Sequence, residues 1–368
     1  MPTAGSPGCP ARFRVRFVPY FEERTAAMRA KGISYETGFV RGGRSSRVRF
    51  DREIVARELR LIRDELHCNA VRIIGGDPER LEIAAACAAD LGLEVWFSPY
   101  PLESSVADML TLFADCAERA ERIRARGAEV VFVTGAELSL MHKGFFPGDT
   151  VEERVRLLTA EPDDLGELVA AVGARVNDFL GEAVSVVRAR FGGPITYASI
   201  PLERVDWTPF DIVSVDLYRT AETAGRFGEG VRALVAQGKP LAITEFGAAT
   251  FAGAGDLGAR GLEIVEYDDI RGPVRLNGDY ARDEDGQGRY LRELLEIFDA
   301  EGVDSAFVFV LALYDHVHRP DGDPRDDLDL AGYGVVKVLE DRDGETYPGV
   351  PWEPKAAFGA LADYYRSH

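Results

Sequence analysis

The sequence predicts an α/β protein, a single-domain (β/α)8 TIM barrel, on the basis of three observations. From Gly32 onward, short β-branched or aromatic runs alternate with longer amphipathic runs, as parallel strands joined by helices do. Several short runs, including residues 130–133 and 307–310, are apolar without alternation, which is typical of strands buried on both faces. The short runs number eight, and eight parallel strands close into a barrel.

The elements follow one another at regular intervals along the chain. The predicted strands are residues 32–37, 70–74, 94–98, 130–134, 195–199, 212–217, 241–246 and 305–311. The predicted helices span about residues 51–66, 78–91, 105–126, 163–191, 221–237, 286–301 and 354–365. Only the fifth strand lacks a convincing helix after it. Gly42 and Gly43 follow the first strand without forming GxGxxG, so a doubly wound nucleotide-binding sheet is disfavoured.

The chain shows no internal repeat and no low-complexity tract, so residues 31–368 are expected to form one domain. Residues 1–30 are expected to be an N-terminal tail, or an added strand or hairpin that closes the barrel floor. Residues 248–285 run long without periodicity and are predicted to be a lid or binding loop, or a plain surface insertion.

Composition restricts the partners. The formal net charge of −19 repels phosphate backbones and anionic membranes, so a neutral or cationic small molecule or oligosaccharide is the expected substrate. Arg12, Arg14 and Arg16 interrupt any apolar leader, which favours a cytoplasmic location. The four cysteines show no CxxC spacing, and neither disulfides, a zinc site nor a cofactor is expected. The sequence does not predict an oligomeric state.

Polar residues at the carboxyl ends of the strands are the candidates for chemistry, because (β/α)8 barrels build their active sites there. The fourth strand is followed by Glu137, the sixth by Tyr218, and the seventh contains Glu245. A carboxylate within an apolar strand loses hydration and is tolerated only when it is paired or functional. Glu245 is therefore predicted to be catalytic, the alternative being an internal ion pair with Arg72.

The run Ile-Thr-Glu-Phe-Gly at residues 243–247, together with a glutamate that ends the fourth strand, resembles clan A of the glycoside hydrolases. That clan consists of retaining (β/α)8-barrel glycosidases. The resemblance implies that Glu245 is the nucleophile and Glu137 the general acid/base. It also implies that Arg72 supports the nucleophile and that Tyr218 donates a hydrogen bond to it.

The pair also suits the reaction itself, since a retaining glycosidase needs two carboxyl groups roughly 5 Å apart. Glu245 is expected to stay ionised beside Arg72 and Tyr218, and Glu137 to hold its proton near neutral pH. The predicted activity is retaining, double-displacement hydrolysis of a small or modified glycoside.

Two positions depart from the clan. Ala136 stands where the clan has an Asn that binds the sugar 2-hydroxyl, and the eighth strand ends in Tyr314 rather than Trp. These departures favour an unusual substrate. They also leave open a barrel redirected to non-hydrolytic transfer or acid/base tailoring of a small metabolite, or a non-catalytic binding barrel.

Further side chains are candidate substrate contacts. Glu36 lies on the first strand, and Trp207 and Tyr314 follow the fifth and eighth, where aromatic rings often stack on sugars; core packing is the alternative for each. His316 is expected to contact substrate. An alternative is a metal centre formed by His316 and His318, although no metal is predicted.

Overall fold

A computed structural model describes residue 1 and residues 27–41, 43–160, 165–268 and 272–368. The tail, strand or hairpin predicted for residues 1–30 lies outside these ranges except at Met1 and residues 27–30. Cys9 is also outside them, whereas Cys68, Cys87 and Cys116 are free and buried. Among the described helices, none combines the length and hydropathy that crossing a membrane requires.

Eight parallel strands form the barrel, as predicted. They are β1 (Ala30–Glu36), β4 (Ala70–Gly75), β5 (Glu94–Pro99), β6 (Val130–Ala136), β7 (Ile195–Ala198), β8 (Val213–Asp216), β9 (Leu241–Phe246) and β12 (Ser305–Val308). Their order in the sheet is β7-β6-β5-β4-β1-β12-β9-β8. A parallel bridge between Ser199 and Val215 brings the two edge strands together and nearly closes the barrel.

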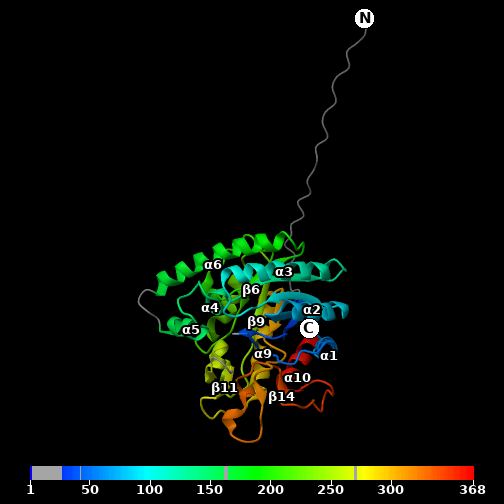
Figure 1. The fold of residues 1–368 in the computed structure, drawn as a ribbon, viewed down its shortest axis with the longest axis vertical. Coiled ribbons are helices and arrows are strands. Elements are labelled where there is room, and N and C mark those ends of the chain that lie inside the picture. Colours follow the sequence, from blue (N-terminus) through cyan, green and yellow to red (C-terminus); the bar gives the residue numbers. More distant parts are fainter. Residues whose placement is uncertain (2–26, 42, 161–164, 269–271) are drawn as a thin grey trace.

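Helices surround the strands. They are α1 (Arg52–Asp64), α2 (Pro78–Asp90), α3 (Val106–Arg124), α6 (Leu165–Arg188), α7 (Phe227–Val235), α9 (Glu284–Glu301) and α10 (Ala356–Ser367). The side chains of Asp51, Asp77 and Ser105 cap the first three by accepting hydrogen bonds from first-turn amides. Helices α2, α3 and α6 lie side by side along one flank (Figure 1). Between β7 and β8 only the 3-10 turn η1 (Pro201–Glu203) is helical, so the helix-poor fifth unit is confirmed.

Shorter elements follow several of the strands. Two short helices, α4 (Leu138–Met141) and α5 (Val151–Thr159), follow β6, and η2 (Ala224–Arg226) precedes α7. The segment 248–285 contains α8 (Ala254–Leu257), η3 (Gly258–Ile264) and a hairpin of β10 (Val265–Asp268) and β11 (Gly272–Leu276). Other small elements are β2 (Val40–Arg41), β3 (Arg44–Ser45), β13 (Val317–His318), η4 (Pro324–Asp326), η5 (Leu328–Ala331), β14 (Val336–Leu339) and β15 (Trp352–Pro354).

The lower part of the barrel interior is filled by apolar side chains. The rings of Trp96 and Phe307 pack there with centroids 4.7 Å apart, and Ala70 and Ala242 belong to the same buried cluster. Gly32 admits the Phe307 ring, because a Cβ there would lie 2.3 Å from it. A second cluster, between strands and helices, forms the outer core. The interior is therefore packed below, and the buried acids Glu36, Asp216 and Glu245 lie toward the carboxyl ends of the strands, here called the mouth.

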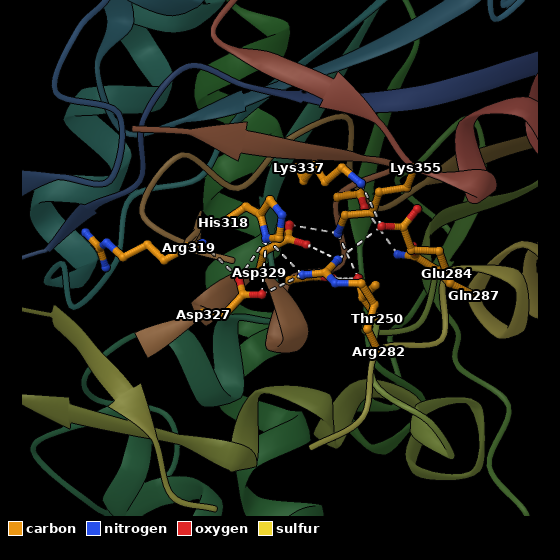
Figure 2. Close-up of polar contacts among 12 residues, drawn as sticks. Thr250, Arg282, Glu284, Gln287, His318, Arg319, Asp327, Asp329, Lys337 and Lys355 are labelled. Carbon is orange, nitrogen blue, oxygen red and sulfur yellow. Dashed lines mark hydrogen bonds and ion pairs between the residues drawn. The ribbon is translucent and has the colours of Figure 1, made fainter. Parts of the chain in front are cut away.

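An ionic network joins the loops that follow β9 and β12 (Figure 2). Arg282 donates hydrogen bonds to Asp327 at 2.9 Å and to Asp329 at 2.7 Å. The ammonium of Lys355 lies 2.8 Å from Asp329 and donates to the Thr250 hydroxyl at 2.7 Å. We call this network the loop clamp; its members are Thr250, Arg282, Glu284, His318, Asp327, Asp329, Lys337 and Lys355. It fixes the two loops against each other beside the mouth.

Candidate active site

Glu137 sits at a sharp turn directly after β6. Its backbone is left-handed (φ 45°), and the preceding Gly135 also has positive φ (84°). The Glu137 amide donates to the Ala198 carbonyl at 2.9 Å, which ties the turn to β7. A left-handed backbone is costly for a residue other than glycine and persists only where surrounding contacts enforce it. The turn directs the side chain into the mouth, where it is 9% exposed.

Glu245 faces the same mouth from β9 and is held from two sides. The hydroxyl of Tyr218 donates to Oε1 at 2.7 Å, and Nη1 of Arg72 lies 3.5 Å from Oε2. Arg72 is fully buried and also donates to the Thr244 carbonyl at 2.8 Å and to the Ser98 hydroxyl at 3.2 Å. These contacts aim the guanidinium at Glu245. The structure thus brings together Glu137, Glu245, Arg72 and Tyr218, the four residues that the sequence motif singled out.

Asp216 adds a third carboxylate that the sequence left without a role. It ends β8, is 3% exposed, and its Oδ1 lies 3.7 Å from Nη1 of Arg72. One oxygen from each of Glu137, Asp216 and Glu245 lies within 4.8 Å of the other two. Within the described part of the chain, neither oxygen of Asp216 has a hydrogen-bond partner. The signal in the sequence was an acidic residue closing an otherwise apolar strand.

The carboxylates raise one another's pKa values. Burial, together with the charges of Glu245, Asp216 and Glu203, holds the pKa of Glu137 well above its ordinary value. Burial and the Asp216 charge raise the pKa of Glu245 to about 8, although Arg72 and Tyr218 favour its ionised form. Burial also raises the pKa of Asp216 despite the nearby guanidinium of Arg72. Burial and mutual repulsion therefore favour the protonated forms of the three groups, which titrate as a set.

Glu203 and Tyr197 support the turn at Glu137 from beneath. The Tyr197 hydroxyl donates to Glu203 at 2.7 Å and accepts from the Leu138 amide at 2.7 Å. The Ser139 amide donates to the other Glu203 oxygen at 2.8 Å. Glu203 comes from the 3-10 turn η1, in the one unit without a helix, and no sequence motif indicated its role. This support orders the backbone just after the proposed acid/base.

Glu36 lies at the mouth end of β1, as expected, and it faces inward. Ser34 and Glu36 point into the barrel, because the alternate residues Ile33 and Tyr35 pack in the outer core. The Tyr314 amide donates to Glu36 at 3.3 Å, and the Ser46 hydroxyl donates to its other oxygen. Burial and the charge of Asp315 raise the pKa of Glu36 to about 7.

Trp207 and Tyr314 do not lie with the carboxylates, and their positions do not fit the sugar stacking expected from sequence. The Tyr314 hydroxyl donates to Glu58 of α1 at 2.5 Å, and the guanidinium of Arg47 lies 3.9 Å from its ring. Tyr314 thus packs between the barrel and α1. The carbonyl of Trp207 accepts a hydrogen bond from Lys239, which precedes β9, so Trp207 lies at the amino ends of the strands. The position of these two residues after a strand did not indicate the direction in which either side chain points.

Other aromatic rings approach Glu245 instead. Tyr333, from the loop after β12, packs edge-on against Tyr218 with centroids 6.0 Å apart, and Phe309 lies 6.0 Å from Tyr333. The Tyr333 hydroxyl donates to the Gly258 carbonyl at 2.6 Å, which links the two long loops. Sequence reasoning missed Tyr333, because it is separated from any strand end by a loop without periodicity.

His316 and His318 contact different carboxylates. Nδ1 of His316 lies 2.7 Å from Asp315, whereas Nδ1 of His318 lies 3.0 Å from Asp327 in the loop clamp (Figure 2). Among the described residues, the acidic, His and Cys side chains that converge as metal ligands do are Glu137, Asp216 and Glu245, and no histidine joins them. The alternative of a metal centre on His316 and His318 therefore has no geometric support.

Comparison with known proteins shows the fold. No family model matches the sequence, and no curated protein does. Solved structures match over most of the chain. A GH113 β-1,4-mannanase has a TM-score of 0.59 at 16% identity, covering 93% of this chain and 100% of that one. A glycoside hydrolase family 5 enzyme from Prevotella bryantii B14 has a TM-score of 0.52 at 11% identity, covering 94% and 98%.

A β-glucuronidase from Parabacteroides merdae also matches, with a TM-score of 0.52 at 13% identity, over 92% of this chain and 36% of that one. At such identities the likeness is one of fold. The chain has the (β/α)8 fold of these glycoside hydrolases. The clan A resemblance predicted from residues 243–247 is confirmed at that level, and the low identity makes the chain a divergent example.

Proposed function

We propose that the protein is a retaining glycoside hydrolase that acts on a small or modified glycoside. The observation that carries the proposal is the approach of Glu137 and Glu245, whose nearest carboxylate oxygens lie within 4.8 Å. Retaining glycosidases hold their two carboxyl groups about 5–5.5 Å apart, whereas inverting enzymes need about 6.5–9.5 Å to admit a water molecule. Nearest oxygens within 4.8 Å are compatible with the separation of a retaining enzyme, which supports direct attack by one carboxylate.

The surroundings assign the two roles. Tyr218 donates to Glu245 and Arg72 lies 3.5 Å away, so Glu245 is the carboxylate whose ionised form is better stabilised. Glu137 has Glu245, Asp216 and Glu203 as acidic neighbours, which favour its protonated form. Glu245 is therefore the nucleophile, and Glu137 is the general acid that later serves as the base.

The reaction then proceeds by double displacement. Glu245 attacks the anomeric carbon while Glu137 protonates the leaving glycosidic oxygen, which gives a covalent glycosyl-enzyme. Glu137, now ionised, removes a proton from water as the water attacks the same carbon and frees Glu245. The charge of the oxocarbenium-like transition state is stabilised by the surrounding carboxylates.

The test is turnover of aryl α- and β-glycosides by the wild type, Glu245→Gln and Glu137→Gln, with the anomer first formed identified by NMR. We expect retention, loss of nearly all hydrolysis in Glu245→Gln, and loss mainly for poor leaving groups in Glu137→Gln. Azide should restore turnover of activated substrates by Glu137→Gln as a glycosyl azide. Inversion, or full activity in either variant, would reject the mechanism. Absence of turnover on every glycoside would favour a redirected barrel.

A further inference from the structure

We propose that the site recognises a glycoside whose sugar carries a protonated amino group, and that Asp216 is the carboxylate that binds this group. The inference rests on the proposed function, and it names the substrate class for the same site. It is carried by the contacts of Asp216 and by the balance of charges at the mouth.

Asp216 is a buried acid, and the hydroxyl of Thr244 is a neighbouring group that favours its ionised form. Asp216 is 3% exposed, and neither carboxylate oxygen has a hydrogen-bond partner among the described residues. An ionised carboxylate offers about four acceptor positions, and a buried polar group left unpaired costs roughly 1–3 kcal/mol. The Asp216 side chain is fully buried beside Arg72, and one of its oxygens lies within 4.8 Å of oxygens of Glu137 and Glu245, so a donor bound among the three carboxylates also approaches Asp216.

The balance of charge identifies the donor as a cation. Retaining hydrolysis requires Glu137 protonated and Glu245 ionised, and Arg72 is the guanidinium beside them. Arg72 lies 3.5 Å from Glu245 and 3.7 Å from Asp216, so one positive charge faces two carboxylates. A sugar hydroxyl would supply a donor but no charge. An ammonium supplies up to three donors and the missing positive charge.

The adjoining wall of the mouth is also acidic. Glu36 is buried there, and the charge of Asp315 contributes to its raised pKa. The nearest guanidinium, that of Arg47, is engaged in a buried ion pair with Glu58 at 2.8 Å. Glu36 thus adds a further acid at the carboxyl ends of the strands, and a surface lined by one sign of charge concentrates ligands of the opposite sign.

A divalent cation is the competing occupant, since three carboxylate oxygens within 4.8 Å suit a hard metal ion. Such an ion would engage Glu137 and Glu245, which the proposed mechanism needs free. The ammonium satisfies Asp216 and leaves both glutamates available. The experiment therefore includes metal binding as an outcome.

Binding is measured first, by calorimetry at pH 6.5, with D-glucosamine, D-galactosamine and D-mannosamine against their parent hexoses. We expect at least one amino sugar to bind 10-fold or more tightly than its parent. Asp216→Asn should remove most of that preference. The matched control is Asp211→Asn, at the other end of the β8 segment, where the carboxylate pairs with Arg188; it should keep the preference. Thermal denaturation verifies that each variant is folded.

A second measurement needs no variant. The preference of the wild type for the amino sugar should disappear as the amine loses its proton, above about pH 8 for an amine of ordinary pKa. The neutral N-acetyl derivative should lose it at every pH. A preference that survives both changes would overturn the inference.

Turnover of the matching aryl 2-amino glycosides separates this inference from the proposed function. Hydrolysis of parent glycosides with no preference for amino sugars would overturn the inference and keep the hydrolase. Asp216-dependent binding of an amino sugar without hydrolysis of any glycoside would keep the recognition and reject the hydrolase. Binding of Mg²⁺ or Ca²⁺ that is lost in Asp216→Asn, with no amino sugar preference, would assign the carboxylates to a metal instead.

Discussion

The hydroxyl of Tyr218 donates a hydrogen bond of 2.7 Å to Oε1 of Glu245. A hydrogen bond to a charged group contributes roughly 1.5–3 kcal/mol. Tyr218→Phe should therefore lower kcat/KM about 10- to 100-fold. Because the same bond lowers the pKa of Glu245, its removal should also move the acidic limb of the pH–rate profile to higher pH. The matched control is Tyr280→Phe, whose hydroxyl bonds Asn277 away from the carboxylates. An unshifted acidic limb would contradict the assignment of Glu245 as the ionised nucleophile.

Glu203 should influence the basic limb of the pH–rate profile. Its charge contributes to the raised pKa of Glu137, so Glu203→Gln should lower that pKa and move the basic limb to lower pH. The acidic limb, which reports Glu245, should move less. Glu121→Gln, a change far from the mouth that removes a partner of Arg124, is the control. A profile that keeps its basic limb in Glu203→Gln would indicate that Glu137 is not the titrating acid.

Glu245 should make the fold less stable as pH rises. Folding raises its pKa to about 8, so the protonated group favours the folded state fully below its ordinary pKa near 4.5. That advantage is lost as pH rises through 8. Glu245→Gln mimics the protonated form and should match the wild type near pH 4, then exceed its melting temperature by roughly 2 °C or more at pH 8. A difference in Tm that stays constant between these pH values would argue against the raised pKa.

The loop clamp makes a separate prediction about stability. Lys355 and Asp329 are both buried and lie 2.8 Å apart, and loss of one partner of a buried pair is strongly destabilising. Lys355→Met should cost about 2–3 kcal/mol, below the full range because Arg282 still contacts Asp329. Lys337→Met removes a more exposed pair with Glu284 and should cost less than about 1 kcal/mol. Urea denaturation at pH 7 measures the free energy of unfolding of both variants. Equal losses would show that burial does not determine how much each ion pair contributes to stability.

Removal of metal ions tests the three-carboxylate cluster directly. If Glu137 and Glu245 act as acid/base and nucleophile, dialysis against a chelator should leave glycoside hydrolysis unchanged, because the mechanism needs no divalent ion. Activity that disappears with the chelator and returns with Mg²⁺ or Ca²⁺ would reassign these side chains as metal ligands.

The sequence predicted the barrel strands well because hydrophobic runs report burial directly. The runs at 70–74 and 94–98, for example, match β4 and β5 to within one residue at their ends. Glu245 could be singled out as a candidate for the same reason, since an unpaired acid within the apolar strand β9 is energetically costly.

The directions of side chains beyond the strand ends could not be predicted. Tyr314 follows β12, yet a hydrogen bond to Glu58 takes its ring outward to α1. Trp207 follows β7 but belongs to the return segment that reaches the amino end of β8. Contacts of this kind join residues distant in sequence, and local periodicity carries no information about them. The sequence showed an acid at the end of a strand at Asp216. That its carboxylate oxygens lack hydrogen-bond partners among the described residues depends on how the barrel packs.

The loop clamp has a consequence for redesign of the protein by loop exchange. Arg282 precedes α9, whereas Asp327 and Asp329 lie beyond β12, so each long loop supplies charges that pair with charges of the other. Transplanting one loop into another barrel, or replacing one here, removes the ion pairs that Arg282 forms with Asp327 and Asp329. The two loops therefore form a single module for laboratory recombination, and libraries that vary both together should yield more folded chimeras than libraries that vary either alone.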